Sequence, residues 1–183
     1  RFSLVQFQGR YLLYGRANPG LHGERYVQVT TSTDLRSWSA FELIDVRSYH
    51  HSQGDMYFFS VQVNPTDPQT LVALVPLVHR LRGCIGLTTS RDGLHWSEIT
   101  PLIRCEVYGE RTAHHPVDGI LVSEEHVDIY VHQNVPGITA DKVTTRGLRR
   151  FPYLRQPPSR LVRYRVPKAT WSRWTDVALS GLS

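Results

Sequence analysis

Apolar and polar residues alternate along this chain in short stretches, separated by turns that contain glycine, proline or serine. Alternation with a period of two is typical of β-strands with one buried face. In the first part of the chain the pattern predicts strands at Leu4–Phe7, Tyr11–Gly15, Tyr26–Thr31 and Phe41–Ile44. We therefore expect a small antiparallel sheet of four strands there.

The same order of elements returns in the middle of the chain. Strands are predicted at Met56–Val63, Leu71–Val78 and Ile85–Thr89, and a short one beyond Trp96 ends near Ile103. Two groups of four strands in the same order indicate a protein built from repeated units, each of them one antiparallel sheet.

A third group of strands is less regular. It is predicted at Val117–Val122, Val127–His132, Leu161–Val166 and, after Trp171 or Trp174, at Val177–Leu179. A segment rich in arginine and proline, at about 135–159, interrupts this group and has the composition of an insertion loop. Little of the chain has the period of a helix.

One nine-residue motif occurs twice. Thr30–Trp38 and Thr88–Trp96 begin 58 positions apart and share five identical residues. In the pattern Ser-x-Asp-Gly-x-x-Trp, the Asp accepts hydrogen bonds from its own turn, Gly permits positive φ, and Trp packs between neighbouring sheets. These roles are structural. The first copy has Leu35 where the second has Gly93, so its turn must form without glycine.

These repeats predict an all-β fold, a β-propeller of four-stranded antiparallel blades. The blade units are expected at about 1–45, 46–104 and 105–183, in a single propeller domain or part of one. A propeller closes with about four to eight blades. With three recognisable units, the other blades are absent from the chain, or another copy or subunit supplies them, or the sheets form an open stack.

Two stretches carry a resemblance to a known family: Gly9–Arg16, and Arg25–Trp38 with its alternating strand and turn. They resemble the five-bladed propeller glycosidases of the invertase, levansucrase and arabinanase type, and Ser90–Trp96 fits as well. A looser likeness to the Asp boxes of sialidases exists, although the turn here is one residue shorter. The resemblance implies a five-bladed propeller, of which this chain is a part, with its chemistry at the central channel.

In the enzymes of that family, three acidic residues converge on the channel from the first strands of successive blades. They act as nucleophile or base, as a group that tunes the acid, and as general acid. The present chain departs from this pattern. Its first inner strand, Phe2–Phe7, has no acid, and the Asn-Asp-Pro signature of invertases is absent.

Three carboxylates remain as candidate catalytic residues. Asp55 opens the inner strand of the second unit, Asp118 lies at the corresponding place in the third, and Glu110 is close by in sequence. The alternative for Asp55 and Asp118 is a structural one, because each neighbours a glycine in what reads as a turn.

Other polar residues are candidates for binding a substrate. His114 and His115 precede Asp118 and form with it a possible acid/base or sugar-binding cluster. The remaining candidates stand at strand ends or on connections, where binding groups accumulate: Arg16, Asn18, Arg25 and His132, with His50-His51 as a weaker pair. Alternatively, Arg16 forms only an ion pair with an acid such as Glu24.

Charge is distributed unevenly. Residues 1–140 hold 11 Lys/Arg against 14 Asp/Glu, whereas residues 141–183 hold 10 against 2. The basic region 142–173 either attracts a protein partner or an anionic surface or is simply a solvated loop. Arginines alternate there with Phe151 and Tyr153, but without a known nucleic-acid-binding fold we do not expect a nucleic-acid partner.

No cofactor or metal is expected. The chain lacks the glycine-rich nucleotide loops and the Gly-x-Ser-x-Gly elbow of serine hydrolases, and its histidines have no metal-ligand spacing. Extended backbone would direct His50 and His51 to opposite sides. Cys84 and Cys105 are either free thiols or one disulfide.

The sequence does not determine the cellular compartment of the protein. No apolar run approaches the roughly 18 residues that span a bilayer, and the first residues are Arg1-Phe2-Ser3, with no targeting signal. This beginning leaves open that the natural ends are missing and that the protein is secreted or endomembrane.

Two functions remain from the sequence. In the first, the chain hydrolyses or binds a glycoside in the central channel. In the second, it is a non-catalytic propeller, either a carbohydrate-binding module or an assembly subunit that docks through region 142–173.

Overall fold

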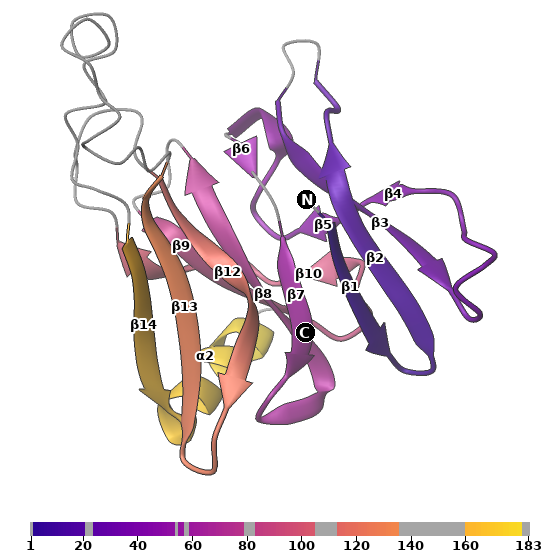
Figure 1. The fold of residues 1–183 in the computed structure, drawn as a ribbon. Helices are drawn as coiled ribbons and strands as arrows, with labels where there is room; N and C mark the ends of the chain where they lie inside the picture. The colour runs from indigo at the N-terminus through magenta and orange to yellow at the C-terminus, as the bar shows by residue number, and fades with distance from the viewer. Residues whose placement is uncertain are drawn as a thin grey trace, which may run out of the picture.

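The described residues form three sheets, almost entirely antiparallel, that lie side by side, and one α-helix (Figure 1). The computed structural model describes residues 2–20, 24–53, 55–56, 59–78, 83–104, 113–135 and 160–180. Most of the described residues are in strands, so the all-β prediction is confirmed. The described residues do not form a closed ring of sheets.

The first sheet contains four strands in sequence order. They are β1 (Phe2–Phe7), β2 (Arg10–Ala17), β3 (Tyr26–Ser32) and β4 (Glu42–Leu43). Gln8 and Gly9, with φ of 48° and 76°, form the two-residue hairpin turn between β1 and β2. Two consecutive positive φ values are typical of a type I′ turn, whose twist matches that of the strands.

The second sheet is larger. Its main strands are β7 (Ser60–Asn64), β8 (Asp67–Val78), β9 (Gly83–Ser90) and β11 (Thr100–Arg104), each paired with the next. Three two-residue strands extend it: β5 (Asp45–Val46), β6 (Asp55–Met56) and β10 (His95–Trp96). The strand predicted at Met56–Val63 is thus divided, because β6 and β7 pair with different parts of β8. A 3-10 turn, η1 (His51–Gln53), precedes β6.

The third sheet has three strands, β12 (Ala113–Val122), β13 (His126–Val135) and β14 (Arg160–Pro167). A fourth strand was predicted at Val177–Leu179, and this prediction is wrong, because α2 (Lys168–Ser180) occupies that place.

The physical reason is a helical pattern at the end of the chain. The buried residues of α2 are Trp171, Thr175, Ala178 and Leu179, at spacings of four, three and one. This spacing puts them on one face of a helix. Trp171 is anchored, since its Nε1 donates to Oδ1 of the buried Asn64 at 3.0 Å.

Two apolar clusters hold the sheets together. The first lies between the first and second sheets and contains Tyr14, Phe59 and Trp96, with ring centroids 4.7–5.9 Å apart. The second, between the second and third sheets, includes Leu74 and Ile129. The second sheet is therefore covered on both faces.

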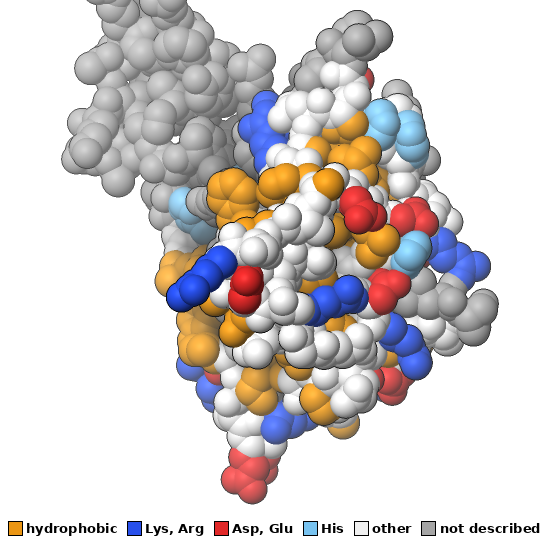
Figure 2. All heavy atoms as spheres, turned by 90° about the vertical axis from the view of Figure 1, so that its right-hand side faces the viewer, with side chains coloured by type: hydrophobic (Ala, Val, Ile, Leu, Met, Phe, Trp, Pro, Cys, Tyr) orange, Lys and Arg blue, Asp and Glu red, His pale blue; other side chains and the backbone are white. Residues whose placement is uncertain are grey.

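The first sheet has one face outside this packing. In β1, exposed Phe2 and Leu4 alternate with buried Ser3 and Val5, which face the second sheet. Figure 2 shows this side of the molecule, where hydrophobic side chains are exposed among basic, acidic and imidazole groups.

Candidate functional site

Many of the predicted site residues lie at one end of the molecule. In Figure 1 the end of β2, the start of β3, β6 and the adjoining ends of β12 and β13 are all towards the top. We call the polar residues there the upper-end group: Arg16, Asn18, Arg25, His50, His51, Asp55, His115 and His132.

Arg25 and Asp55 form the tightest contact of the upper-end group. The Arg25 Nη1 donates to Asp55 Oδ2 at 2.8 Å, and the Arg25 backbone N–H donates to Asp55 Oδ1 at 2.9 Å. In addition, the Met56 N–H donates to the Arg25 carbonyl at 2.9 Å. Both carboxylate oxygens of Asp55 are thus engaged, and the contact joins the start of β3 in the first sheet to β6 of the second.

Arg16 and Asn18 lie near the end of β2. The Arg16 Nε donates to Asn18 Oδ1 at 3.0 Å, so Asn18 orients the guanidinium. Arg16 lies two residues beyond Tyr14 and hence on the face of β2 that points towards the second sheet, yet it is exposed. An exposed, oriented guanidinium is suited to binding oxygen atoms of a ligand.

His50 and His51 do not point to opposite sides, because η1 bends the chain there. Their ring centroids are 4.0 Å apart, with the rings tilted by 37°. The His50 Nδ1 accepts a hydrogen bond from the Ser52 N–H at 3.3 Å and lies 2.9 Å from Ser52 Oγ. The neutral ring therefore carries its proton on Nε2.

Two tyrosines that the sequence analysis did not select extend this aromatic group. Tyr26 stacks on Tyr49 with centroids 6.2 Å apart and meets His51 edge-on at 6.1 Å. Burial raises the pKa of both tyrosines to about 12. Both hydroxyls are therefore protonated at neutral pH and remain hydrogen-bond donors. Aromatic faces beside polar groups are typical of binding sites for small ligands.

His115 and His132 are directly opposite each other on β12 and β13, and both are half-buried. Cross-strand partners on one face of a sheet are in contact distance. The sequence separation of 17 hides this pair, which only the strand register reveals.

The other candidates are placed only in part. His114 and Asp118 belong to β12, but their side chains lie outside the described residues, as does Glu110 entirely. Gly119 has φ +94° and sits within a register irregularity between Pro116 and Ile120. Asp118 therefore lies within an irregular stretch of a strand and does not belong to a turn between strands.

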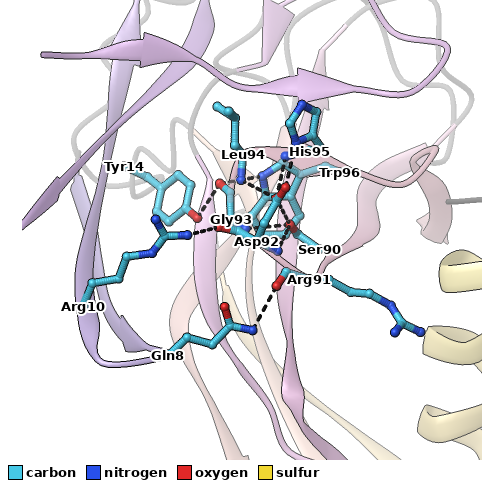
Figure 3. Close-up of polar contacts among 10 residues, drawn as sticks. All are labelled: Gln8, Arg10, Tyr14, Ser90, Arg91, Asp92, Gly93, Leu94, His95 and Trp96. Atoms are coloured by element: carbon cyan, nitrogen blue, oxygen red, sulfur yellow. Dashed lines mark hydrogen bonds and ion pairs between the residues drawn. The ribbon is translucent and has the colours of Figure 1, made fainter. Parts of the chain in front are cut away.

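The second copy of the repeated motif forms a dense hydrogen-bond network (Figure 3). Asp92 Oδ1 accepts from the N–H groups of Leu94 and His95 at 2.8 and 2.9 Å. The Gly93 carbonyl accepts from Tyr14 Oη at 2.8 Å and from Trp96 Nε1 at 3.1 Å. These residues serve the fold, as the motif predicts.

Two further chemistries were searched for within the described residues. No three His, Cys, Asp or Glu side chains come together there in a way that would hold a metal ion. Within the described residues, the α-helix α2 is too short and too polar to cross a membrane.

Comparison with known proteins gives a structural likeness only. No family model and no curated sequence matches the chain. A solved structure, an N-acetylgalactosamine deacetylase from F. plautii in complex with blood group B trisaccharide, superposes with a TM-score of 0.54 and 15% identity. The match covers 96% of this chain and 52% of the deacetylase, so the chain spans about half of that structure. At this identity the likeness concerns the fold alone.

Proposed function

We propose that this chain is a carbohydrate-active β-propeller, or part of one, that binds a glycoside at its upper end and hydrolyses it there. The three stacked sheets, almost entirely antiparallel, support the propeller architecture. The resemblance of Gly9–Arg16 and Arg25–Trp38 to propeller glycosidases supports a carbohydrate as the substrate. The deacetylase with a similar fold acts on an amino sugar and was solved with a trisaccharide bound.

One observation carries the proposal. Strand ends that carry polar residues lie at the same end of the molecule in all three sheets (Figure 1). Among these residues, Arg16 is exposed and oriented by Asn18, and His115 and His132 are cross-strand partners on the third sheet. Hydroxyl-rich ligands are bound by such combinations of planar donors, imidazoles and aromatic faces. Tyr26, Tyr49 and His51 supply the aromatic part.

For hydrolysis, the proposal assigns the chemistry to carboxylates. Asp118, three residues after His115, is the candidate general acid or base, with Glu110 as a second carboxylate. Glycoside hydrolysis needs one group that protonates the leaving oxygen and another that attacks the sugar or activates water. Asp55 has a different role, because Arg25 holds both of its oxygens; it fixes the β3 end beside the site.

The test uses two variants with different expected losses. Arg16→Ala should weaken saccharide binding, measured by calorimetry with a panel of oligosaccharides. Asp118→Asn should retain binding but lose turnover, measured by release of reducing sugar. Circular dichroism of both variants should match the wild-type spectrum. Unchanged hydrolysis by Asp118→Asn would count against the catalytic assignment, and unchanged binding by Arg16→Ala would count against the site.

A second function is favoured by a separate observation. β1 has no acidic residue and Asp55 is held in an ion pair, which leaves fewer carboxylates for catalysis. We propose as the alternative a propeller that binds a carbohydrate, or docks a partner through region 142–173, without catalysis. Binding to neutral sugars should hardly depend on salt, whereas docking through arginines should weaken as salt screens the charges.

A further inference from the structure

The outer face of the first sheet exposes an unusual number of large apolar side chains. These residues form what we call the first outer face: Phe2, Leu4, Leu35, Trp38, Phe41 and Leu43, which are 36–66% exposed. The side of the molecule that carries the first sheet is shown in Figure 2. Large apolar side chains exposed together on one side of a protein mark an interaction site.

The second copy of the motif shows what covers such a turn. Three side chains of the first sheet and its hairpin reach the second turn (Figure 3). Each donates to one of three consecutive carbonyls: Tyr14 Oη to Gly93 at 2.8 Å, Arg10 Nη2 to Asp92 at 3.0 Å and Gln8 Nε2 to Arg91 at 3.2 Å. As a result Trp96 is only 1% exposed.

The first copy has the same three backbone carbonyls, but among the described residues no neighbouring sheet covers them. Thr33, Asp34 and Leu35 correspond to Arg91, Asp92 and Gly93, and all three are exposed. Within the described ranges no side chain donates to their carbonyls. Trp38, which corresponds to Trp96, is 36% exposed.

We propose that the first outer face docks a further antiparallel sheet of the same repeat type, contributed by the same polypeptide. The hairpin of that sheet presents a tyrosine hydroxyl to the Leu35 carbonyl. A guanidinium and an amide on the same hairpin meet the carbonyls of Asp34 and Thr33. The inference rests on the propeller architecture in the proposed function, but it uses no residue of the upper-end group, so its test and the test of the glycoside site can fail separately.

A second copy of this chain fits the face less well. The outer face of its third sheet offers Tyr130 four residues after His126, as Tyr14 follows Arg10. The turn before β13, however, carries Glu124 where the first sheet has Gln8. A carboxylate is an acceptor only and cannot donate to a carbonyl. Its charge would also lie beside Asp34, which is unfavourable.

The length of the solved neighbour points the same way. The shared fold takes up 52% of the deacetylase chain, so in that protein more polypeptide accompanies the part that matches. A sheet that belongs to the same polypeptide is held close to the first outer face, so its effective concentration there is high. A modest interface is then sufficient for docking.

The test compares two tryptophans within one molecule. Hydroxyl-radical footprinting with peptide mass spectrometry is applied to the 183-residue chain and to the protein purified from its natural source, whose intact mass is also measured. In the 183-residue chain Trp38 should be oxidised several-fold faster than Trp96. In the natural protein Trp38 should fall to the rate of Trp96 at every dilution, while the exposed Val177 on α2 is unchanged.

Three outcomes overturn the proposal. They are a natural protein of only 183 residues, an equally reactive Trp38 in a longer one, and protection that disappears on dilution, which would assign the face to a separate chain. Leu35→Lys adds a check that does not depend on oxidation. It should lower the midpoint of thermal unfolding of the natural-length protein and leave that of the 183-residue chain unchanged; equal effects would contradict docking.

Discussion

The two copies of the nine-residue motif have the same internal structure in different surroundings. In both, a Ser hydroxyl accepts from the N–H three residues later, Leu35 to Ser32 at 2.9 Å and Gly93 to Ser90 at 2.8 Å. Among the described residues, only the second turn lies beneath a neighbouring sheet. Local sequence therefore builds the turn, whereas the neighbouring sheet decides whether its tryptophan is buried.

The difference between leucine and glycine at one position follows from space. Leu35 and Gly93 have φ of 60° and 84°, so both backbones are left-handed. A Cβ on Gly93 would lie 2.5 Å from Leu12 Cδ2 and 2.7 Å from Tyr14 Oη. Leu35 has no such cover, and its side chain is exposed. Packing against the first sheet thus excludes a side chain at position 93. The open first turn has room for the Leu35 side chain, although a left-handed backbone is unfavourable for leucine.

The largest expected effect is the loss of the buried tryptophan. Trp96→Ala should lower the free energy of unfolding by about 3–5 kcal/mol, because it removes the side chain that packs on Tyr14 and Phe59. Trp38→Ala, the matched control, should cost less than about 1 kcal/mol. Urea unfolding of both variants measures the difference. Equal losses would show that the two environments do not differ energetically.

Gly93→Ala should be the next most harmful change. Alanine at positive φ costs about 1–2 kcal/mol, and crowding of the methyl group by Leu12 and Tyr14 adds about 1–3 kcal/mol. Leu35→Ala keeps the Cβ at the same backbone conformation in the open turn and should be nearly neutral. Thermal unfolding of the two variants checks the contrast; a neutral Gly93→Ala would refute the packing argument.

Removal of one hydroxyl should have an intermediate effect. Burial raises the pKa of Tyr14, so its hydroxyl stays protonated and donates to the Gly93 carbonyl. Tyr14→Phe should cost about 0.5–1.5 kcal/mol, since Trp96 Nε1 still reaches that carbonyl. Tyr11→Phe, on the opposite face of the same strand, is the control. A larger loss for Tyr11→Phe than for Tyr14→Phe would argue against this hydrogen bond.

The two turns should also differ in their response to pH. The hydrogen bond to Asp92, 2.7 Å away, raises the pKa of His95 above its usual 6.5. A group with a raised folded pKa stabilises fully below its unfolded pKa, and this stabilisation is lost as pH rises through the folded pKa. The second turn should therefore weaken above pH 6.5, whereas the first, with Ser37 at the corresponding position, should not.

NMR titration of His95 measures this difference. Asp92→Asn keeps an oxygen for the backbone N–H groups and should return the pKa of His95 towards its usual value. An unchanged pKa in that variant would show that another group is responsible.

At acid pH both turns should behave alike: backbone hydrogen bonds lower the pKa of Asp34, and in Asp92 hydrogen bonds outweigh the opposing effect of burial. Both contributions are present above pH 3.8 and are lost as pH falls below it.

The smallest expected effect is a gain. Leu35→Gly relieves the left-handed conformation of a branched residue but adds freedom to the unfolded chain. The net result should be a stabilisation of about 0.5 kcal/mol, measured by the midpoint of thermal unfolding. Destabilisation would mean that the exposed Leu35 side chain already has a stabilising contact.

The sequence predicts the strands well because half-buried strands have a strict period of two. Its main error in the fold is α2, where Trp171 and Thr175 were not recognised as one helical face after two groups of strands had suggested a third. The division of Met56–Val63 into β6 and β7 was also missed. An apolar run does not show where its pairing with β8 is interrupted.

The candidate site was predictable as a set of residue types at strand ends, but its contacts were not. Arg25 and Asp55 are 30 positions apart, and only the stacking of two sheets brings them together. His115 and His132 meet through a register that contains irregularities. Predictions about Glu110 and about the side chains of His114 and Asp118 remain predictions.

The outermost strand of the third sheet has a consequence for solubility. β14 pairs with β13 on one side only, and the next element is a helix, so its other side is a free sheet edge among the described residues. Such an edge can template fibril-like addition of other strands. Arg160, Arg163 and Arg165 are spaced along this strand. Because Arg165 is paired with Asp128, we expect the charge of Arg160 and Arg163 to disfavour the addition of further strands at this edge.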